Sequence, residues 1–181
     1  MVLVTVDELA ATPVVRVDAE SPEWCLYNAQ EDILTSEHTY TVVVGVDGSP
    51  SSKNALRWAI WHANQNEGRI VAVRAWDVPG LYAWDIPGPE QFAQQTSMAL
   101  GETINEVTSQ PTVPITNDVI QGQPVEALLN AAENANADLL VVGNRGHGGF
   151  AGALLGSVSQ QVVHYARCPV VIMREKDHDT R

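Results

Sequence analysis

A glycine-rich stretch between a strand and a helix constrains the fold of this chain more than any other feature. It spans Asp138–Ser159 and reads DLLVVGNRGHGGFAGALLGSVS. The apolar run Leu139–Val142 predicts a buried strand, six glycines follow it, and a helical pattern starts at Ser157. Glycine allows the backbone to approach a ligand closely, and the first turn of a helix presents N–H groups that attract anions. The stretch therefore predicts a loop that holds the phosphates of a nucleotide.

Apolar runs and helical spacings predict that strands and helices alternate along the rest of the chain. The expected strands are Thr39–Val46, Ile70–Ala75, Thr112–Ile120, Leu139–Val142 and Val170–Met173. The expected helices begin near Pro50, Pro89, Pro124 and Ser157. The apolar side of the second helix is expected to comprise Phe92, Met98 or Ala99, Ile104 and Val107. This alternation indicates an α/β fold, a single doubly wound domain with an open, mostly parallel five-stranded sheet and helices on both faces.

The ends of two predicted strands locate the expected site. In open parallel sheets, ligands bind at the carboxyl ends of the strands, where the strand order reverses. The first strand leads into Asp47, and the fourth ends at Gly143. If these two strands are neighbours, Asp47 faces the glycine-rich loop, and its carboxylate can accept a hydrogen bond from a ribose hydroxyl.

Acidic residues gather in the N-terminal part of the chain. The formal net charge is −12, and residues 1–38 contain eight acids but only one base. This balance argues against a nucleic acid or an anionic membrane as a partner. Residues 1–38 show no sustained period, so we expect an acidic extension of unknown role, a domain over residues 39–174 and a charged tail over residues 175–181.

The N-terminus and the cysteines indicate a cytoplasmic protein. The first residues are apolar but lack a basic region, so they predict neither a signal peptide nor a membrane span. Cys25 and Cys168 are the two cysteines, and they show no metal-ligand spacing. Free thiols in a reducing compartment are the expectation.

The glycine-rich loop lacks two common nucleotide signatures and carries a third pattern. No glycine is followed by lysine, so the Walker A motif is absent, and the dinucleotide fingerprint is missing after the first strand. Instead, Gly143, Gly146, Gly156 and Ser157 form the pattern G-x2-G-x9-G-S.

With this pattern, the chain resembles the nucleotide-binding branch of the universal stress protein family. The resemblance extends from about Tyr40 to Met173 and leaves out residues 1–38. It rests on VVVGVDGS, ALRWA, GQPVEALLNAAENANADLLVVGNRGHGG and GSVSQQVVHYARCPVVIM, which occur in this order. The resemblance implies that the domain binds ATP, with or without magnesium, and forms a homodimer through its last strand, Val170–Met173. That strand is apolar and is expected at a sheet edge, where pairing with another chain is favoured.

The resemblance also implies which residues surround the nucleotide. Ribose and base would meet the first strand's end, the adenine edge would meet the backbone of Ala75, and the remaining residues would wrap the phosphates. The implied residues are Gly45, Val46, Asp47, Ala75, Val142, Gly143, Arg145, Gly146, His147, Gly156, Ser157, Val158 and Ser159. Asp47 could also hold a magnesium ion through water.

The scarcity of cations favours binding over catalysis. Fast phosphoryl transfer needs positioned cations, yet the chain has only Lys53 and Lys176 as lysines, and Arg145 is the basic residue of the loop. We therefore expect a nucleotide-responsive regulator in a stress or dormancy response, with slow or no hydrolysis and no catalytic residue. A weak ATPase or phosphotransferase, a cyclic-nucleotide binder and a nucleotide-free scaffold remain as alternatives.

Overall fold

The structure is a computed structural model that describes residues 3–4, 38–77, 88–147 and 154–174. The chain divides into two units, one of residues 1–5 and 40–181 and one of residues 6–39, and all described helices and strands belong to the first. Almost all of the predicted acidic extension and the whole predicted tail, residues 175–181, lie outside the described residues.

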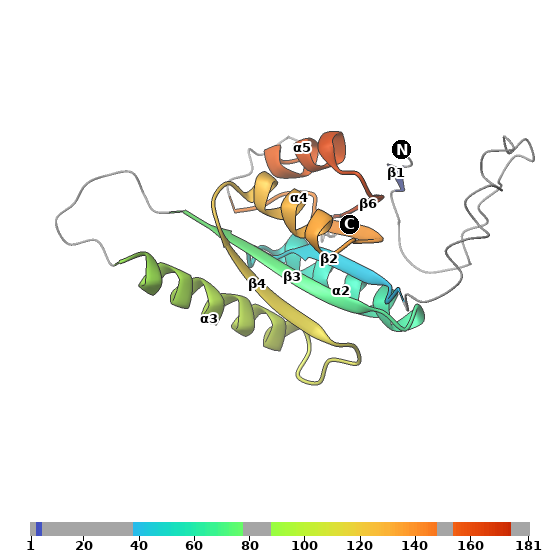
Figure 1. Ribbon diagram of the computed structural model, residues 1–181, viewed down its shortest axis with the longest axis horizontal. Helices are drawn as coiled ribbons and strands as arrows, with labels where there is room; N and C mark the ends of the chain where they lie inside the picture. The colour runs from blue at the N-terminus through green and yellow to red at the C-terminus, as the bar shows by residue number, and fades with distance from the viewer. Residues whose placement is uncertain (1–2, 5–37, 78–87, 148–153, 175–181) are drawn as a thin grey trace, which may run out of the picture. The chain divides into compact units, whose positions relative to one another are not determined.

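Strands and helices alternate in the predicted order (Figure 1). The elements are β1 (Leu3–Val4), β2 (Thr41–Gly45), α2 (Pro50–Gln65), β3 (Arg69–Trp76), α3 (Pro89–Val107), β4 (Ile115–Gln121), α4 (Pro124–Asn134), β5 (Leu139–Gly143), α5 (Ser157–Tyr165) and β6 (Val170–Met173). Proline opens α2, α3 and α4, where its fixed φ suits the first helical turn and its missing N–H costs no hydrogen bond. The predicted α/β fold is therefore confirmed, and the two-residue strand β1 adds to the five predicted strands.

The strand order places a topological switch point at the centre of the sheet. The order is β1-β6-β5-β2-β3-β4, and all neighbouring pairs are parallel. From β2 the chain moves outward through β3 and β4, then returns to the other side of β2 to form β5 and β6. The carboxyl ends of β2 and β5 therefore lie side by side, with their following helices on opposite faces.

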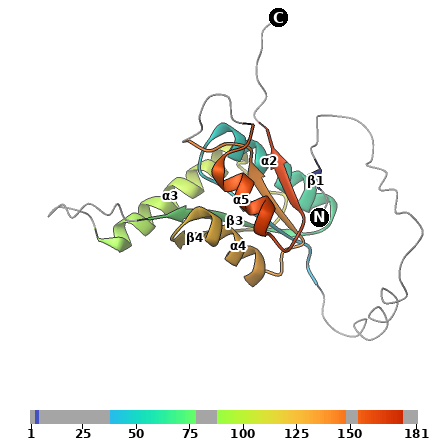
Figure 2. The ribbon, with the colours of Figure 1, turned by 90° about the horizontal axis from the view of Figure 1, so that it is seen from above.

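Alternating side chains of the central strands build two cores. On one face, Val42 and Val44 of β2 pack in a cluster with α2 and α3, and on the other Val43 packs with α4 and α5 (Figures 1 and 2). All three valines are fully buried. Because both faces are covered, the strand reads as a continuous apolar run rather than as an alternating one.

The outer edge of β6 differs from the prediction. We expected β6 to be an edge strand, but β1 pairs with it in parallel, with Leu3 opposite Val170 and Val4 opposite Val171. β6 therefore has β5 on one side and β1 on the other. Pairing β6 with a second copy along these residues would require displacement of β1.

The apolar side of α3 is also rotated from the prediction. Met98 is 60% exposed, whereas Leu100 is fully buried and Ile104 nearly so. Leu100 and Ile104 lie four residues apart and hence on one side of the helix, which packs over β3 and β4. Ile104 and Val107 pack in the core as expected, and Leu100 takes the central place that we assigned to Met98 or Ala99.

Candidate functional site

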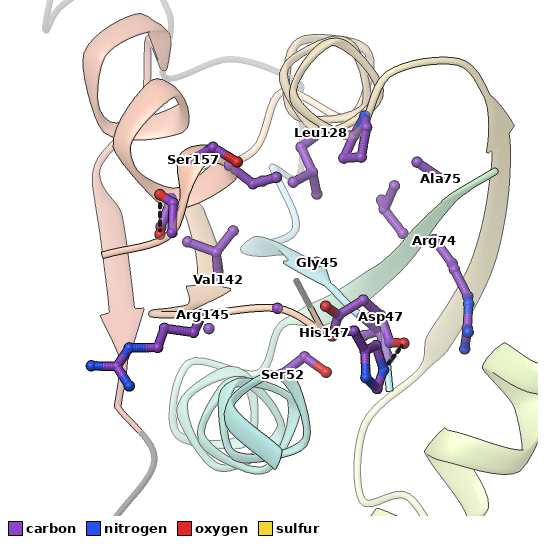
Figure 3. A pocket seen from close by; sticks show the side chains of 18 residues that line it. Gly45, Asp47, Ser52, Arg74, Ala75, Leu128, Val142, Arg145, His147 and Ser157 are labelled. Atoms are coloured by element: carbon purple, nitrogen blue, oxygen red, sulfur yellow. Dashed lines mark hydrogen bonds between the residues drawn. The ribbon is translucent and has the colours of Figure 1, made fainter. Parts of the chain in front are cut away.

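A cavity of about 400 Å³ lies at the carboxyl ends of β2 and β5 (Figure 3). All thirteen residues named from the sequence line it. They are joined by Ser52, Val73, Arg74, Pro124 and Leu128, which the sequence did not indicate. The predicted placement of Asp47 opposite the glycine-rich loop is confirmed, because β2 and β5 are neighbours in register. Gly148, Gly149 and Gly152 of that loop lie outside the described residues.

Two glycines of the loop allow the backbone to pass very close to β2 and α2. A Cβ on Gly146 would lie 2.6 Å from Oδ2 of Asp47. A Cβ on Gly143 would lie 2.5 Å from Oγ of Ser51 and 2.9 Å from the backbone nitrogen of Ser52. Real Cβ atoms do not approach other atoms so closely. Gly143 therefore requires glycine for space because the backbone of α2 is in the way, whereas a side chain at Gly146 would require the Asp47 carboxylate to move. The glycines therefore set how tightly the loop closes against Asp47.

Asp47 is held in place by the start of α2. Its Oδ1 accepts hydrogen bonds from the backbone N–H of Ser49 at 2.9 Å and from the Ser49 hydroxyl at 2.6 Å. Burial alone would raise the pKa of Asp47, but the hydrogen bonds from Ser49 and Ser52 and the nearby His147 outweigh it and lower the pKa below its ordinary value. Asp47 is therefore an ionised acceptor at neutral pH, and its Oδ2 faces the loop at Gly146.

Serines at the start of α2 tie that helix to the loop. Ser49 is the N-cap, and its Oγ accepts from the backbone N–H of Ser52 at 3.3 Å. The hydroxyl of Ser51, which is 1% exposed, donates to the backbone carbonyl of Arg145. Arg145 thus takes part in the cavity through its backbone, while Figure 3 shows its guanidinium turned away from Asp47 and His147.

The loop returns to α5 through backbone contacts at Asn144. The carbonyl of Asn144 accepts from the N–H of Gly156 at 2.7 Å and from the hydroxyl of Ser159 at 3.0 Å. Ser159 is buried, so its hydroxyl hydrogen serves this closure and not the cavity. Ser157 is exposed, and the N–H groups of the first helical turn have no intrahelical acceptor. The anion-attracting groups here are therefore the helix N–H groups and the Ser157 hydroxyl.

An apolar slot faces these polar groups. Leu128 of α4 approaches β2 so closely that a Cβ on Gly45 would lie 3.2 Å from its Cδ2. Pro124, Ala75 and Val142 complete the slot. Its walls carry no charge, which suits a flat aromatic base.

Two basic side chains lie on the other side of Asp47. The imidazole Nε2 of His147 is 3.0 Å from the carbonyl oxygen of Asp47, so it carries the hydrogen and donates. Arg74 comes from β3 and was missed from the sequence, where a charged residue within an apolar strand has no distinctive pattern. The alternation of β3 was the available signal, because it turns Arg74 to the face opposite Ala75, toward α2 and α3.

The described residues contain neither a cluster of metal ligands nor a helix suited to a membrane. No three His, Cys, Asp or Glu side chains of that part gather closely enough to hold a metal ion. None of its helices is both long and apolar enough to cross a membrane.

Comparison with known proteins agrees with this geometry. The model of the universal stress protein family matches residues 39–174. Universal stress protein Rv2005c of Mycobacterium tuberculosis is 36% identical over 149 residues, which cover 82% of this chain and 50% of that protein. This chain thus spans about half the length of the curated relatives it matches.

Solved structures show the same fold. A universal stress protein in complex with cAMP is 33% identical, with a TM-score of 0.55 over 74% of this chain and 95% of its own. Universal stress protein UspA from Lactobacillus plantarum is 20% identical, with a TM-score of 0.62 over 77% of this chain and 100% of its own.

Proposed function

Because the chain belongs to the universal stress protein family, we propose that it binds an adenine nucleotide in the cavity at β2 and β5. We further propose that the bound nucleotide regulates a partner protein in a stress or dormancy response in the cytoplasm. The observation that carries the proposal is the cavity itself, in which an apolar slot, an ionised acceptor and a helix N-terminus line one space. Its volume, about 400 Å³, lies within the range of small-molecule sites.

The order of chemical groups along the cavity supports one orientation of the nucleotide. The base fits the slot between Leu128 and Ala75, where backbone groups of β3 can meet its polar edge. The ribose hydroxyls reach Oδ2 of Asp47, since Oδ1 is already occupied by Ser49. The 5′-phosphates then lie against Gly146 and the first turn of α5, where free N–H groups favour negative charge.

ATP is our first candidate for the ligand, and magnesium would accompany it through the phosphates. Magnesium prefers oxygen ligands and usually keeps several waters. Asp47 is the one carboxylate among the lining residues, so the protein could hold the ion through water from Oδ2. The donor set therefore fits a metal that arrives with the nucleotide.

The lining residues support slow or absent hydrolysis. Among them there is no lysine, and the described lysine Lys53 forms an ion pair with Glu106 at 2.5 Å instead. Positioned cations and a group that orients the attacking nucleophile are what fast phosphoryl transfer needs. Release of ADP over time measures the alternative, a weak ATPase or phosphotransferase.

A cyclic nucleotide is the second candidate ligand. The solved family member that is 33% identical to this chain was crystallised in complex with cAMP. Neither the slot nor Asp47 requires a chain of three phosphates, so competition between ATP and cAMP decides between these ligands.

A homodimer through β6 is also part of the proposal. β6 is apolar and pairs with β1 only along Val170 and Val171. Two copies would join their sheets if β1 gave up this pairing. Unpaired strand edges favour such association.

The test compares the parent with Gly156→Glu, which places a carboxylate where the phosphates are proposed to lie. A Cβ on Gly156 meets its nearest neighbours at 3.5 Å, an ordinary contact, so the variant should fold. Gly101→Glu is the matched control, because a Cβ there has no neighbour within 4 Å and the residue lies on α3, away from the cavity. Native mass spectrometry and titration calorimetry should find adenine nucleotide on the parent and on Gly101→Glu, and about tenfold weaker binding or none for Gly156→Glu. A parent that binds neither ATP nor cAMP would overturn the proposed function.

A further inference from the structure

Three polar side chains from separate elements converge above Gly48, beside the proposed ribose position. A Cβ built on Gly48 would lie 3.6 Å from Nε2 of His147, 3.7 Å from Nη1 of Arg74 and 3.8 Å from Oγ1 of Thr103. Gly48 has a φ of +90°, a conformation that other residues rarely adopt, so the position stays free of a side chain. Arg74 and His147 also line the cavity, so this cluster borders it.

Arg74 is the cation of this group that lacks a counter-ion. It is partly buried, and among the described residues no carboxylate lies within ion-pair distance of its guanidinium and no acceptor binds it. Two other arginines of that part have partners, Arg167 with Glu133 and Arg57 with Asn54, whereas Nε of Arg145 is buried without one. A partly buried guanidinium without a partner is a ready site for an anion, because it offers several donors in a fixed geometry.

His147 is oriented by the backbone of Asp47. Nε2 donates to the carbonyl of Asp47 at 3.0 Å, which holds the ring over Gly48, and in the doubly protonated imidazolium Nδ1 is a second donor that can bind an anion. Thr103 takes a packing role instead, because its hydroxyl donates to the carbonyl of Ala99 at 2.8 Å. Arg74 and His147 are therefore the two groups of this cluster with bonding capacity to spare.

The location of this pair determines which part of a nucleotide it can meet. This step rests on the proposed function, in which the base lies against Leu128 and the 5′-phosphates lie against α5. The ribose then turns its 2′,3′ edge to Asp47, and the next groups beyond Asp47 are Arg74 and His147 (Figure 3). An anion attached to that edge would gain both contacts, whereas the 5′-phosphates lie on the opposite side of the sugar.

We propose that Arg74 and His147 form an anion subsite that favours adenine nucleotides carrying a free phosphate at the 3′ position. The Asp47 carboxylate does not exclude such a ligand. Its Oδ1 accepts two hydrogen bonds from Ser49, which stabilise the negative charge, and the nearby His147 stabilises it further. A nucleotide with a 3′-hydroxyl would use Asp47 alone and leave Arg74 without a partner.

The test is calorimetric titration of the full chain with adenosine, 5′-AMP, 3′-AMP and 3′,5′-cyclic AMP. The affinity ratio of 3′-AMP to adenosine should be at least about ten for the parent, as expected for charge-assisted hydrogen bonds. Arg74→Gln should reduce this affinity ratio to near one, and Arg74→Lys should keep part of the tighter binding of 3′-AMP. His147→Gln, at an exposed position, should lower the ratio severalfold without affecting folding. Arg57→Gln removes the same charge from an exposed position of α2 and should leave the ratio unchanged.

The outcomes separate this subsite from the proposed function. If Arg74→Gln loses the tighter binding of 3′-AMP over adenosine, the result supports the inference. If only the binding of the cyclic compound falls, the inference is overturned, because that phosphate is tied to the 5′ oxygen. A ratio that is unchanged in both Arg74→Gln and His147→Gln, or that falls equally in Arg57→Gln, overturns the inference even if 5′-AMP binds. Absence of binding by all four compounds and ATP overturns the proposed function, and the inference with it.

Discussion

Replacing Gly143 with alanine should destabilise the fold, because β5 and α2 leave no space for a methyl group at this position. The new Cβ would lie 2.5 Å from Oγ of Ser51, 2.9 Å from its carbonyl carbon and 2.9 Å from the backbone nitrogen of Ser52. Two of these atoms belong to the backbone of α2, so rotation of one side chain cannot remove the clash. Gly143 does not have a positive φ, so the expected loss comes from space alone.

The magnitude follows from two contributions. Overpacking that shifts backbone costs about 1–3 kcal/mol. The shift also breaks the hydrogen bond from Ser51 to the carbonyl of Arg145, which is worth about 1 kcal/mol. We therefore expect Gly143→Ala to lower the free energy of unfolding by about 2–4 kcal/mol. Gly101→Ala should instead raise it by about 0.5–1 kcal/mol, because Gly101 lies in a helix and has open space around it.

Urea denaturation followed by circular dichroism measures both variants at matched protein concentration. The slope of the transition should stay constant, so that the shift in midpoint reports stability. A Gly143→Ala variant within about 0.5 kcal/mol of the parent would refute the argument from space. So would a variant that gains stability as Gly101→Ala does.

Two further predictions concern pH and the sheet edge. Burial lowers the pKa of His62, whose ring stacks on Trp58 with centroids 4.7 Å apart, so folding favours the neutral imidazole. Its contribution to stability is present above the unfolded pKa, near 6.5, and is lost as the pH falls through the lower folded pKa. Between pH 7.5 and 5 the melting temperature should therefore fall less for His62→Gln than for the parent, while the exposed control His164→Gln should match the parent. Equal slopes for all three would contradict this. Deleting residues 2–5 removes β1 and should raise the dimer fraction in analytical ultracentrifugation, because the edge of β6 becomes free to pair. An unchanged dimer fraction would contradict the idea that β1 protects this edge.

Local patterns were sufficient for the order of elements and for most of the cavity lining. The continuous apolar runs of β2 and β5 are typical of strands covered on both faces, and prolines and glycines limit the helices between them. The pattern G-x2-G-x9-G-S then placed Gly143, Gly146 and Gly156 on one loop. Each of these patterns is formed by residues that are close together in the sequence, which is why the sequence alone reveals it.

Features that depend on the rotation of a helix or on residues far apart in the sequence were not predicted. Met98 and Leu100 are both apolar, and only the position of α3 over β3 and β4 decides that Leu100 is buried. Arg74 interrupts an apolar strand without a motif, so its place beside His147 emerges only when β3 and β5 lie on either side of β2. The direction of the Arg145 guanidinium, which points away from Asp47 and His147, also had no signal in the sequence.

The sequence by itself determined that this chain forms a parallel α/β domain with a glycine-rich loop before its last helix, because periodicity and glycine spacing act locally. Tertiary structure alone decided how far Asp47 and that loop approach each other, which groups are saturated by Ser49 and Ser51, and that Arg74 has no partner among the described residues. Those properties depend on distances between β2, β3, β5 and the start of α2, and strand order sets such distances. The same reason applies to the edge of β6, which β1 covers from the far end of the chain.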